Sequence, residues 1–344
     1  MDAELLATAR AAATPDIVGW LLERTDPAAR HLALRDLALA ADAGELAAAQ
    51  AAAMAADPIR AILAAQEPEG YWVKPGGGYG PKYTGTVWQV IFLDQLGADP
   101  ADPRVRAACE YILDHTQAVN GGFSYNAAPR RPPPSGAAPC LHGNLLAAML
   151  RFGLADDPRV ADAVRFLVDA ETAAEGHVYY QSSYAGPTFS CGVNGKQPCG
   201  WGGTKAVIAL ARVPAELRTT SHARALRKGV DFLLSVDPST ALYPMTPGTT
   251  RPSGTWFKLG FPLGYSADVL QVMEAVCEAG AAADPRLEPA VAWLLAQRTR
   301  DGRWLNRNAY HGKLWTDFEK QGAPSKLVTV RALRVLKLVA EATS

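Results

Sequence analysis

Residues 102–123 read DPRVRAACEYILDHTQAVNGGF, and both ends of this stretch recur along the chain. The opening phrase, Asp-Pro-Arg followed by Val or Leu, begins at Asp102, Asp157 and Asp284. An Asp at this place accepts hydrogen bonds from the free N–H groups of a first helical turn. Pro at the next position loses nothing, because its missing N–H has no partner there. Each copy therefore predicts the start of a helix.

The closing phrase is a Gln followed, four or five residues later, by a Gly, with an aromatic residue two positions beyond the Gly. It occupies residues 66–72, 117–123 and 297–304, with a weaker copy at 171–178 that starts with Glu171. Gly in this position ends a helix, and the aromatic residue is placed to fold back onto it. The copies are 51, 54 and 126 residues apart, the last being two units of about 63, so the sequence predicts an array of similar helical hairpins.

Apolar residues at helical spacing, bounded by caps and breakers, predict twelve helices and almost no strand. One short piece, Val178-Tyr179-Tyr180, favours an extended conformation. The predicted helices cover 15–24, 28–40, 45–66, 84–97, 103–116, 139–153, 158–170, 200–213, 222–235, 263–280, 285–298 and 326–342.

Short and long connections alternate between these helices, and the long ones are rich in Gly, Pro and aromatic residues. Helices that follow a long loop are small or apolar on all sides, whereas those opened by Asp-Pro-Arg have a polar face. We therefore expect an all-α fold, an (α/α)6 toroid of six helical hairpins with an inner and an outer ring. The inner ring would contain 28–40, 84–97, 139–153, 200–213, 263–280 and 326–342.

Domain organisation follows from the extent of the repeat. Because it runs through most of the 344 residues, we expect a single domain. Residues 1–25 would form an N-terminal outer helix segment, and residues 26–342 the repeat array.

Composition excludes several classes of function. The 34 basic and 34 acidic residues give no net charge, so no nucleic-acid partner is expected. No apolar run is long enough for a transmembrane helix, and the acidic start lacks the features of a secretory signal. Five cysteines, an odd number, fit a reducing compartment. The sequence predicts a soluble, cytoplasmic protein of unknown oligomeric state.

The hairpins and their Gln-Gly-aromatic turns resemble the prenyltransferase and squalene-cyclase repeat superfamily, over roughly residues 25–342. The resemblance implies a toroid around an apolar cavity, whose mouth is built by the long loops and the N-termini of the inner helices. It also implies an isoprenoid substrate, although a fold does not fix a function.

The catalytic motifs of that superfamily are incomplete here. Cyclases of this kind protonate an alkene with an Asp-x-Asp-Asp-Thr-Ala motif, but the matching stretch, 262–267, reads PLGYSA. No Asp-Asp-x-x-Asp motif for diphosphate is present either. As replacement catalytic residues we consider Asp268 as a general acid or base, together with Tyr265, His311 and Asp317.

Cysteines form a second constellation. Protein prenyltransferases hold zinc with Asp-x-Cys and a later His, and residues 197–201 resemble that site at Cys199 alone. Cys140 and Cys199 start neighbouring inner helices, and Cys191 lies in the loop that leads into the second of these, so their pKa values are expected to be lowered. With His142 they would form a zinc site. A redox-active thiol pair and simple packing remain as alternatives, and no nucleotide cofactor is expected.

Aromatic and cationic residues gather in the long loops and at inner-helix starts. Aromatic faces around a dry cavity would stabilise a carbocation or grip an apolar chain, while lysines would attract an anionic group. Trp72, Phe123 and Trp304 are expected to hold their loops down instead. The substrate-binding candidates are Lys82, Tyr83, Trp201, Lys258, Trp315 and Lys326.

These observations favour a terpenoid cyclase-like or prenyltransferase-like enzyme that acts on a small hydrophobic ligand, with or without an anionic group, inside the toroid. Two alternatives stay open. One is a metal-dependent enzyme that uses the cysteines on a non-isoprenoid substrate. The other is a non-catalytic toroid that binds a ligand or a partner segment.

Overall fold

The computed structural model describes residues 1–125, 136–178, 185–244 and 251–343. Within them the chain forms fourteen α-helices and one short antiparallel hairpin, β1 (Ser190–Cys191) with β2 (Gln197–Pro198). Tyr179 and Tyr180, expected to be extended, lie outside the described residues. The helices are α1 (Ala3–Arg10), α2 (Pro15–Leu21), α3 (Pro27–Asp36), α4 (Ala43–Met54), α5 (Ile59–Ala64), α6 (Thr86–Leu96), α7 (Pro103–His115), α8 (Pro139–Arg151), α9 (Pro158–Thr172), α10 (Gly200–Arg212), α11 (Thr220–Leu233), α12 (Val269–Glu278), α13 (Glu288–Ala296) and α14 (Lys326–Ala342).

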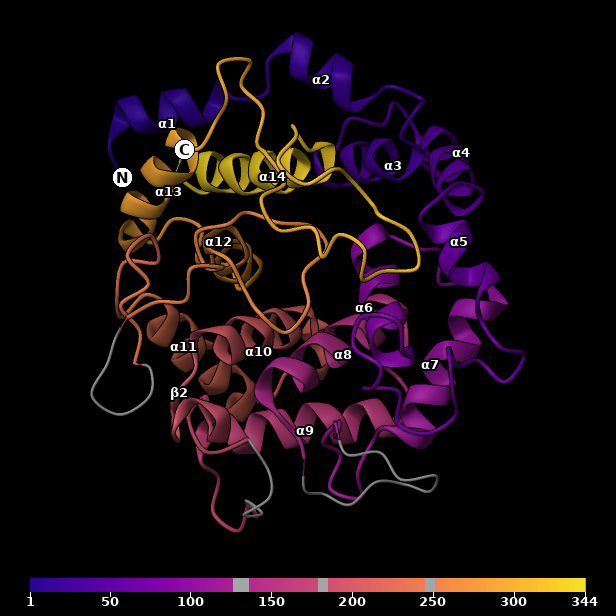
Figure 1. Cartoon of the computed structure of the whole chain (residues 1–344). Coiled ribbons are helices and arrows are strands. Elements are labelled where there is room, and N and C mark those ends of the chain that lie inside the picture. Colours follow the sequence, from indigo (N-terminus) through magenta and orange to yellow (C-terminus); the bar gives the residue numbers. More distant parts are fainter. Residues whose placement is uncertain (126–135, 179–184, 245–250, 344) are drawn as a thin grey trace.

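The helices form two concentric rings (Figure 1). Helices α3, α6, α8, α10, α12 and α14 make the inner ring, in which each packs on the next and α14 returns to α3. The outer ring consists of α4 with α5, then α7, α9, α11 and α13, and finally α1 with α2. The predicted (α/α)6 toroid is confirmed, including α3 as the sixth inner member. None of the helices in the described ranges is long and apolar enough to cross a bilayer.

Helix boundaries differ from the prediction where proline intervenes. The predicted helix 45–66 is two helices, because Pro58 cannot donate a backbone hydrogen bond and separates α4 from α5. The inner helix expected from residue 263 begins at Val269, after a stretch that contains Pro262 and Gly264. Helix α1 lies within the predicted N-terminal outer helix segment, 1–25, although no separate helix was predicted over its residues.

The Asp-Pro-Arg motifs at 102 and 157 cap α7 and α9 as predicted, whereas Asp284 caps a short 3-10 turn, Pro285–Leu287, that leads into α13. The Oδ1 atoms of Asp102, Asp157 and Asp284 accept the N–H two residues later at 2.9, 2.8 and 2.9 Å, respectively. The arginine of the motif has a further role, since Arg159 also pairs with Asp114 of the preceding outer helix at 2.8 Å. The motif therefore starts a helix and joins it to its neighbour.

The Gln of the closing motif bridges two consecutive repeats. The side chain of Gln66 donates to the carbonyl of Gly70 in its own turn at 3.3 Å and to that of Arg104 at 2.9 Å. Gln117 likewise donates to the carbonyl of Arg159 at 2.6 Å. Both acceptors belong to Asp-Pro-Arg motifs, so the two repeated phrases contact each other in space.

The aromatic residues of the closing motif hold their loops against the helices, as expected. Trp72 donates its indole N–H to the carbonyl of Ile62 at 2.8 Å, and Trp304 donates to that of Leu294 at 2.9 Å. Both tryptophans and Phe123 are fully buried. Because these rings are enclosed by their own repeat, they are unavailable to a ligand.

Candidate functional site

A cavity of about 580 Å³ opens at the N-terminal ends of inner helices α6, α8 and α10. Much of its wall is aromatic, from the first turns of α6 and α10 and from the long loops. The aromatic lining residues are Tyr79, Trp88, Tyr125, Trp201, Tyr243, Trp256 and Tyr265. This is the place where the resemblance implied an apolar cavity.

The aromatic rings on one side of the cavity contact one another in series. Ring centroids of Tyr79 and Trp88 are 5.3 Å apart, those of Trp88 and Tyr265 6.4 Å, and those of Tyr265 and Trp201 5.9 Å. Such tilted and edge-on pairs hold each ring in place. The predicted residues Tyr265 and Trp201 thus belong to one continuous apolar surface.

Tyr83 supports this surface from behind instead of lining the cavity. Its ring lies 5.1 Å from that of Trp88 and 4.4 Å from that of Tyr310. Burial raises the pKa of its hydroxyl, which also interacts with Tyr265. Tyr83 is therefore a neutral hydrogen-bonding group next to the cavity.

Lys82 is the basic residue among the described residues that line the cavity. Its Nζ lies 4.7 Å from the centroid of the Tyr265 ring, a cation–π distance. Its side chain is exposed, which places the charge at the solvent end of the aromatic wall. No carboxylate is found among the described lining residues.

Cys140, Cys191 and Cys199 all line this cavity, in agreement with their expected convergence. Cys191 ends β1, and its sulfur interacts with the Cys199 thiol and with the backbone N–H groups of Val193 and Asn194. The hydrogen bond with Cys199 is the largest influence, and it lowers the pKa of Cys191 to about 6. The lowered pKa favours the thiolate form of Cys191 in the cavity wall.

The other two thiols behave oppositely to the sequence prediction. Interaction with the Cys191 thiolate raises the pKa of Cys199 well above its ordinary value, because Cys199 must keep its proton to donate it. Burial raises the pKa of Cys140 to about 11. The expectation of three lowered pKa values was wrong for these two, since desolvation and a neighbouring thiolate outweigh their position at helix starts.

The predicted zinc site is not supported. Within the described ranges, no group of three or more His, Cys, Asp or Glu side chains is arranged to hold a metal ion. His142 has both ring nitrogens engaged, since Nδ1 accepts the N–H of Phe123 at 3.1 Å and Nε2 lies 2.9 Å from the carbonyl of Ala163. Thr86 and Thr329 accept the corresponding N–H in other repeats, so His142 is a structural residue of the motif.

Asp268, the predicted acid, is a buried helix cap. Its Oδ1 accepts the N–H of Gln271 at 2.8 Å, its Oδ2 accepts that of Gly260 at 3.1 Å, and Arg331 lies 3.5 Å away. It does not line the cavity. The structure therefore assigns Asp268 to the start of α12 and not to the site.

His311, Asp317 and Trp315 lie in the last long loop, outside the cavity lining. His311 Nδ1 and Asp317 Oδ2 are 2.6 Å apart in a surface pair, and 68% of the histidine side chain is exposed. Trp315 donates its indole N–H to the carbonyl of Thr84 at 3.2 Å. These contacts attach the last loop to the loop that carries Lys82.

Of the three lysines predicted to bind substrate, only Lys82 lines the cavity. Lys258 is exposed and does not line it. Lys326 is buried at the start of α14 and pairs with Glu23 at 2.8 Å and with Asp26 at 2.5 Å. It therefore joins the N-terminal segment to the inner ring instead of meeting a ligand.

Sequence reasoning missed a buried lysine behind the cavity. Lys205 of α10 is fully enclosed and donates to the side-chain oxygen of Gln271 at 2.5 Å. Burial lowers its pKa to about 7. Its position in an otherwise apolar inner-helix run was a signal that could have identified it. The polar lining residues Asn144, Asn194 and Ser253 carry no comparable sequence signal.

No protein-family profile matches the chain, and no curated protein sequence matches it. Solved structures do resemble it. Glycosyl hydrolase family 88 from Bacteroides vulgatus is 13% identical over 95% of this chain and 98% of that chain, with a TM-score of 0.51. Type II terpene cyclase MstE from Scytonema is 16% identical over 98% and 99%, with a TM-score of 0.47. A family 105 glycoside hydrolase from C. acetobutylicum is 12% identical over 98% of both chains, with a TM-score of 0.47.

The likeness to these structures is one of fold. The family 88 structure supports the α/α toroid, so the resemblance expected from the repeated motifs is confirmed at that level. Identities this low do not transfer a substrate or a catalytic residue.

Proposed function

We propose that this chain is an enzyme of the terpenoid cyclase-like or prenyltransferase-like kind, which acts on a hydrophobic substrate inside its aromatic cavity. The proposal rests on the continuous aromatic wall at the N-termini of the inner helices, which has the cation of Lys82 at its solvent end. The substrate class we infer is an isoprenoid chain, with or without an anionic head group.

The size and chemistry of the cavity support this substrate class. A volume of about 580 Å³ lies in the range of small-molecule sites. The faces of Trp88, Trp201 and Tyr265 would contact an apolar chain and stabilise a positive charge that develops on it. Lys82 would attract an anionic head group and hold it at the mouth.

The reaction would not start with an aspartic acid of the cyclase type. Asp268 is engaged in capping α12, and the described cavity lining contains no carboxylate. The reactive group that the wall does contain is the Cys191 thiolate, which is hydrogen-bonded to the Cys199 thiol. We therefore place nucleophilic attack or proton abstraction, where the reaction needs it, at the Cys191 sulfur.

The test is incubation of the purified protein with farnesyl diphosphate, geranylgeranyl diphosphate and squalene, followed by mass spectrometry of products. We expect turnover of at least one of them, and a loss of about tenfold or more in Trp201→Ala. Lys82→Gln should raise KM for a diphosphate substrate, whereas Lys258→Gln, a loop lysine away from the cavity, should not. No turnover of any of the three compounds would contradict the proposal.

A second candidate is a non-catalytic toroid that binds an apolar ligand. The lack of a His, Asp or Glu in the described lining favours it, because these residues are the commonest general acids and bases of enzymes. Native mass spectrometry separates the two functions. A stoichiometric ligand that is recovered chemically unchanged, and that Trp201→Ala releases, would favour binding over catalysis.

A further inference from the structure

A second hollow lies at the C-terminal ends of inner helices α8, α10 and α12, the ends opposite those that form the aromatic cavity. Its volume is about 420 Å³, and the charged residues that line it are Arg151, Arg212, Arg334 and Glu278. Three cations and one anion therefore face the same space. None of these residues lines the aromatic cavity.

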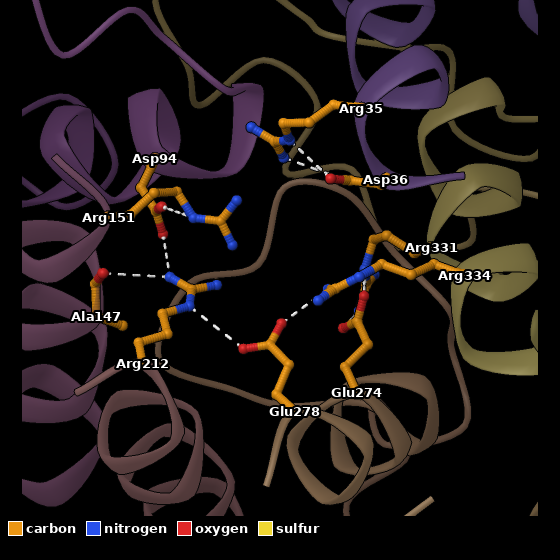
Figure 2. Close-up of polar contacts among 10 residues, drawn as sticks. All are labelled: Arg35, Asp36, Asp94, Ala147, Arg151, Arg212, Glu274, Glu278, Arg331 and Arg334. Carbon is orange, nitrogen blue, oxygen red and sulfur yellow. Dashed lines mark hydrogen bonds and ion pairs between the residues drawn. The ribbon is translucent and has the colours of Figure 1, made fainter. Parts of the chain in front are cut away.

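The carboxylates around this hollow are shared between arginines (Figure 2). Asp94 Oδ1 lies 2.8 Å from Arg151 Nε, and its Oδ2 lies 3.0 Å from Arg212. Glu278 lies 3.3 Å from Arg212 and 2.7 Å from Arg334. Among the lining arginines and their direct ion-pair partners, two carboxylates thus serve three guanidinium groups, which leaves one positive charge in excess. Asp36 also lies near Arg151 and Arg334, but it is paired with Arg35 at 2.6 Å.

The excess charge is shared by the three arginines, and Arg151 presents the free edge of its guanidinium. Its ion pair with Asp94 uses only Nε, and its two terminal nitrogens have no partner among the described residues (Figure 2). Arg212 beside it lowers the pKa of Arg151 to about 10, so the group is still charged at neutral pH. The free edge of the guanidinium is a planar fork of N–H donors, the geometry that binds phosphate and carboxylate oxygens in pairs.

We propose that this hollow is a binding site for a phosphate group, held by the terminal nitrogens of Arg151 with Arg212 and Arg334. A bound dianion would supply the missing counter-charge and relieve the repulsion between neighbouring arginines. The hollow is larger than inorganic phosphate, so it accommodates a phosphate monoester with a small organic group. This site is separate from the aromatic cavity and does not depend on the function proposed for it.

Thermal unfolding in increasing inorganic phosphate, at constant ionic strength adjusted with chloride, tests the proposal. In the wild-type protein we expect Tm to rise with phosphate concentration. In Arg151→Gln the apparent Kd should weaken at least tenfold, while Asp94 keeps its pair with Arg212 and the fold is retained. Arg165→Gln, an exposed arginine paired with Asp162 on α9, is the matched control and should bind phosphate normally.

Two further variants keep the test decisive. Arg151→Lys preserves the charge beside Asp94 but not the fork, and it should also bind more weakly than the wild type. Lys258→Gln should leave phosphate binding unchanged, since Lys258 is a loop lysine that lines neither hollow. No effect of phosphate on the wild type, an equal effect in Arg151→Gln, or a loss in Lys258→Gln would each overturn the proposal.

Discussion

Two cysteines eight residues apart have opposite acid–base properties because they share a hydrogen bond. The Cys191 sulfur accepts hydrogen bonds from the Cys199 thiol and from two backbone N–H groups, and these bonds stabilise its negative charge. Cys199 stays protonated for the same reason. An apolar cavity that contains a thiolate is a reactive environment, since the anion there has few water molecules to solvate it.

Alkylation of Cys191 should follow this arrangement. With iodoacetamide, the rate at Cys191 should be half-maximal near pH 6, because the thiolate is the nucleophile and its pKa is about 6. Cys199→Ala removes the main hydrogen bond and should move the midpoint toward the ordinary value for a thiol. Peptide mass spectrometry across pH measures both rates, with the buried Cys109 as an internal control. An unchanged midpoint in Cys199→Ala would contradict the pairing.

At the scale of residues, sequence alone identified part of the site. Tyr265, Trp201, Lys82 and the three cysteines were predicted, since they lie beside inner-helix starts, and the structure brings them to one cavity. Asp268 could not be excluded in advance, because an Asp before a helix can either cap it or face a ligand. Only side-chain geometry distinguishes these roles.

At the scale of elements, Glu171 occupies the place that Gln holds in other repeats. Its carboxylate accepts the N–H of Phe189, and it is almost completely buried. Burial raises its pKa from 4.5 to about 8. A glutamic acid at this position therefore makes the stability of one repeat depend on pH, which a glutamine would not do.

Glu171→Gln should flatten that dependence. A carboxyl with a raised folded-state pKa favours folding below pH 4.5, and this contribution is lost as pH rises through about 8. Relative to the variant, the wild type should lose up to about 1.4 kcal/mol of unfolding free energy per pH unit in this window. Urea denaturation between pH 5 and 8 measures it. Glu175→Gln, exposed in the same loop, should behave like the wild type, and parallel curves for all three proteins would refute the idea.

Most helices could be predicted because a recognisable sequence motif stands at each end of several repeats. The Asp-Pro-Arg start and the Gln-Gly-aromatic turn each form hydrogen bonds between residues two to four positions apart, so both are recognisable in sequence. The late start of α12 was missed because Pro262 and Gly264 break an apolar run whose spacing still looks helical. Contacts between repeats, such as that of Gln117 with Arg159, required coordinates.

At the scale of the whole molecule, the six inner helices meet in an ionic layer away from the aromatic cavity. Charged residues from α3, α6, α8, α10, α12 and α14 surround one space (Figure 2). Burial disfavours ionisation of Glu278, but Arg212 and Arg334 outweigh it and hold the pKa of Glu278 at about 2. This carboxylate thus connects three inner helices, α10, α12 and α14.

Glu278→Gln should weaken the closed ring. Two arginines would lose their shared counter-charge, and we expect a loss of about 3 kcal/mol of unfolding free energy at pH 7. Since the folded-state pKa is depressed, the difference from wild type should be present above pH 4.5 and shrink as pH falls toward 2. Chemical denaturation at several pH values provides the measurement. Glu341→Gln, exposed on α14, is the control, and equal stability of the two variants at pH 7 would count against the ionic layer.

Closure of the inner ring joins helices from opposite regions of the chain, since α14 packs on α3 and Lys326 pairs with Glu23 and Asp26. During synthesis, about 300 further residues must therefore be translated after the start of α3 before α14, its final neighbour, leaves the ribosome. Until then, the apolar side of α3 that packs on α14 lacks its native partner. A nascent chain with this topology is a natural client for a chaperone that shields exposed helices while translation continues.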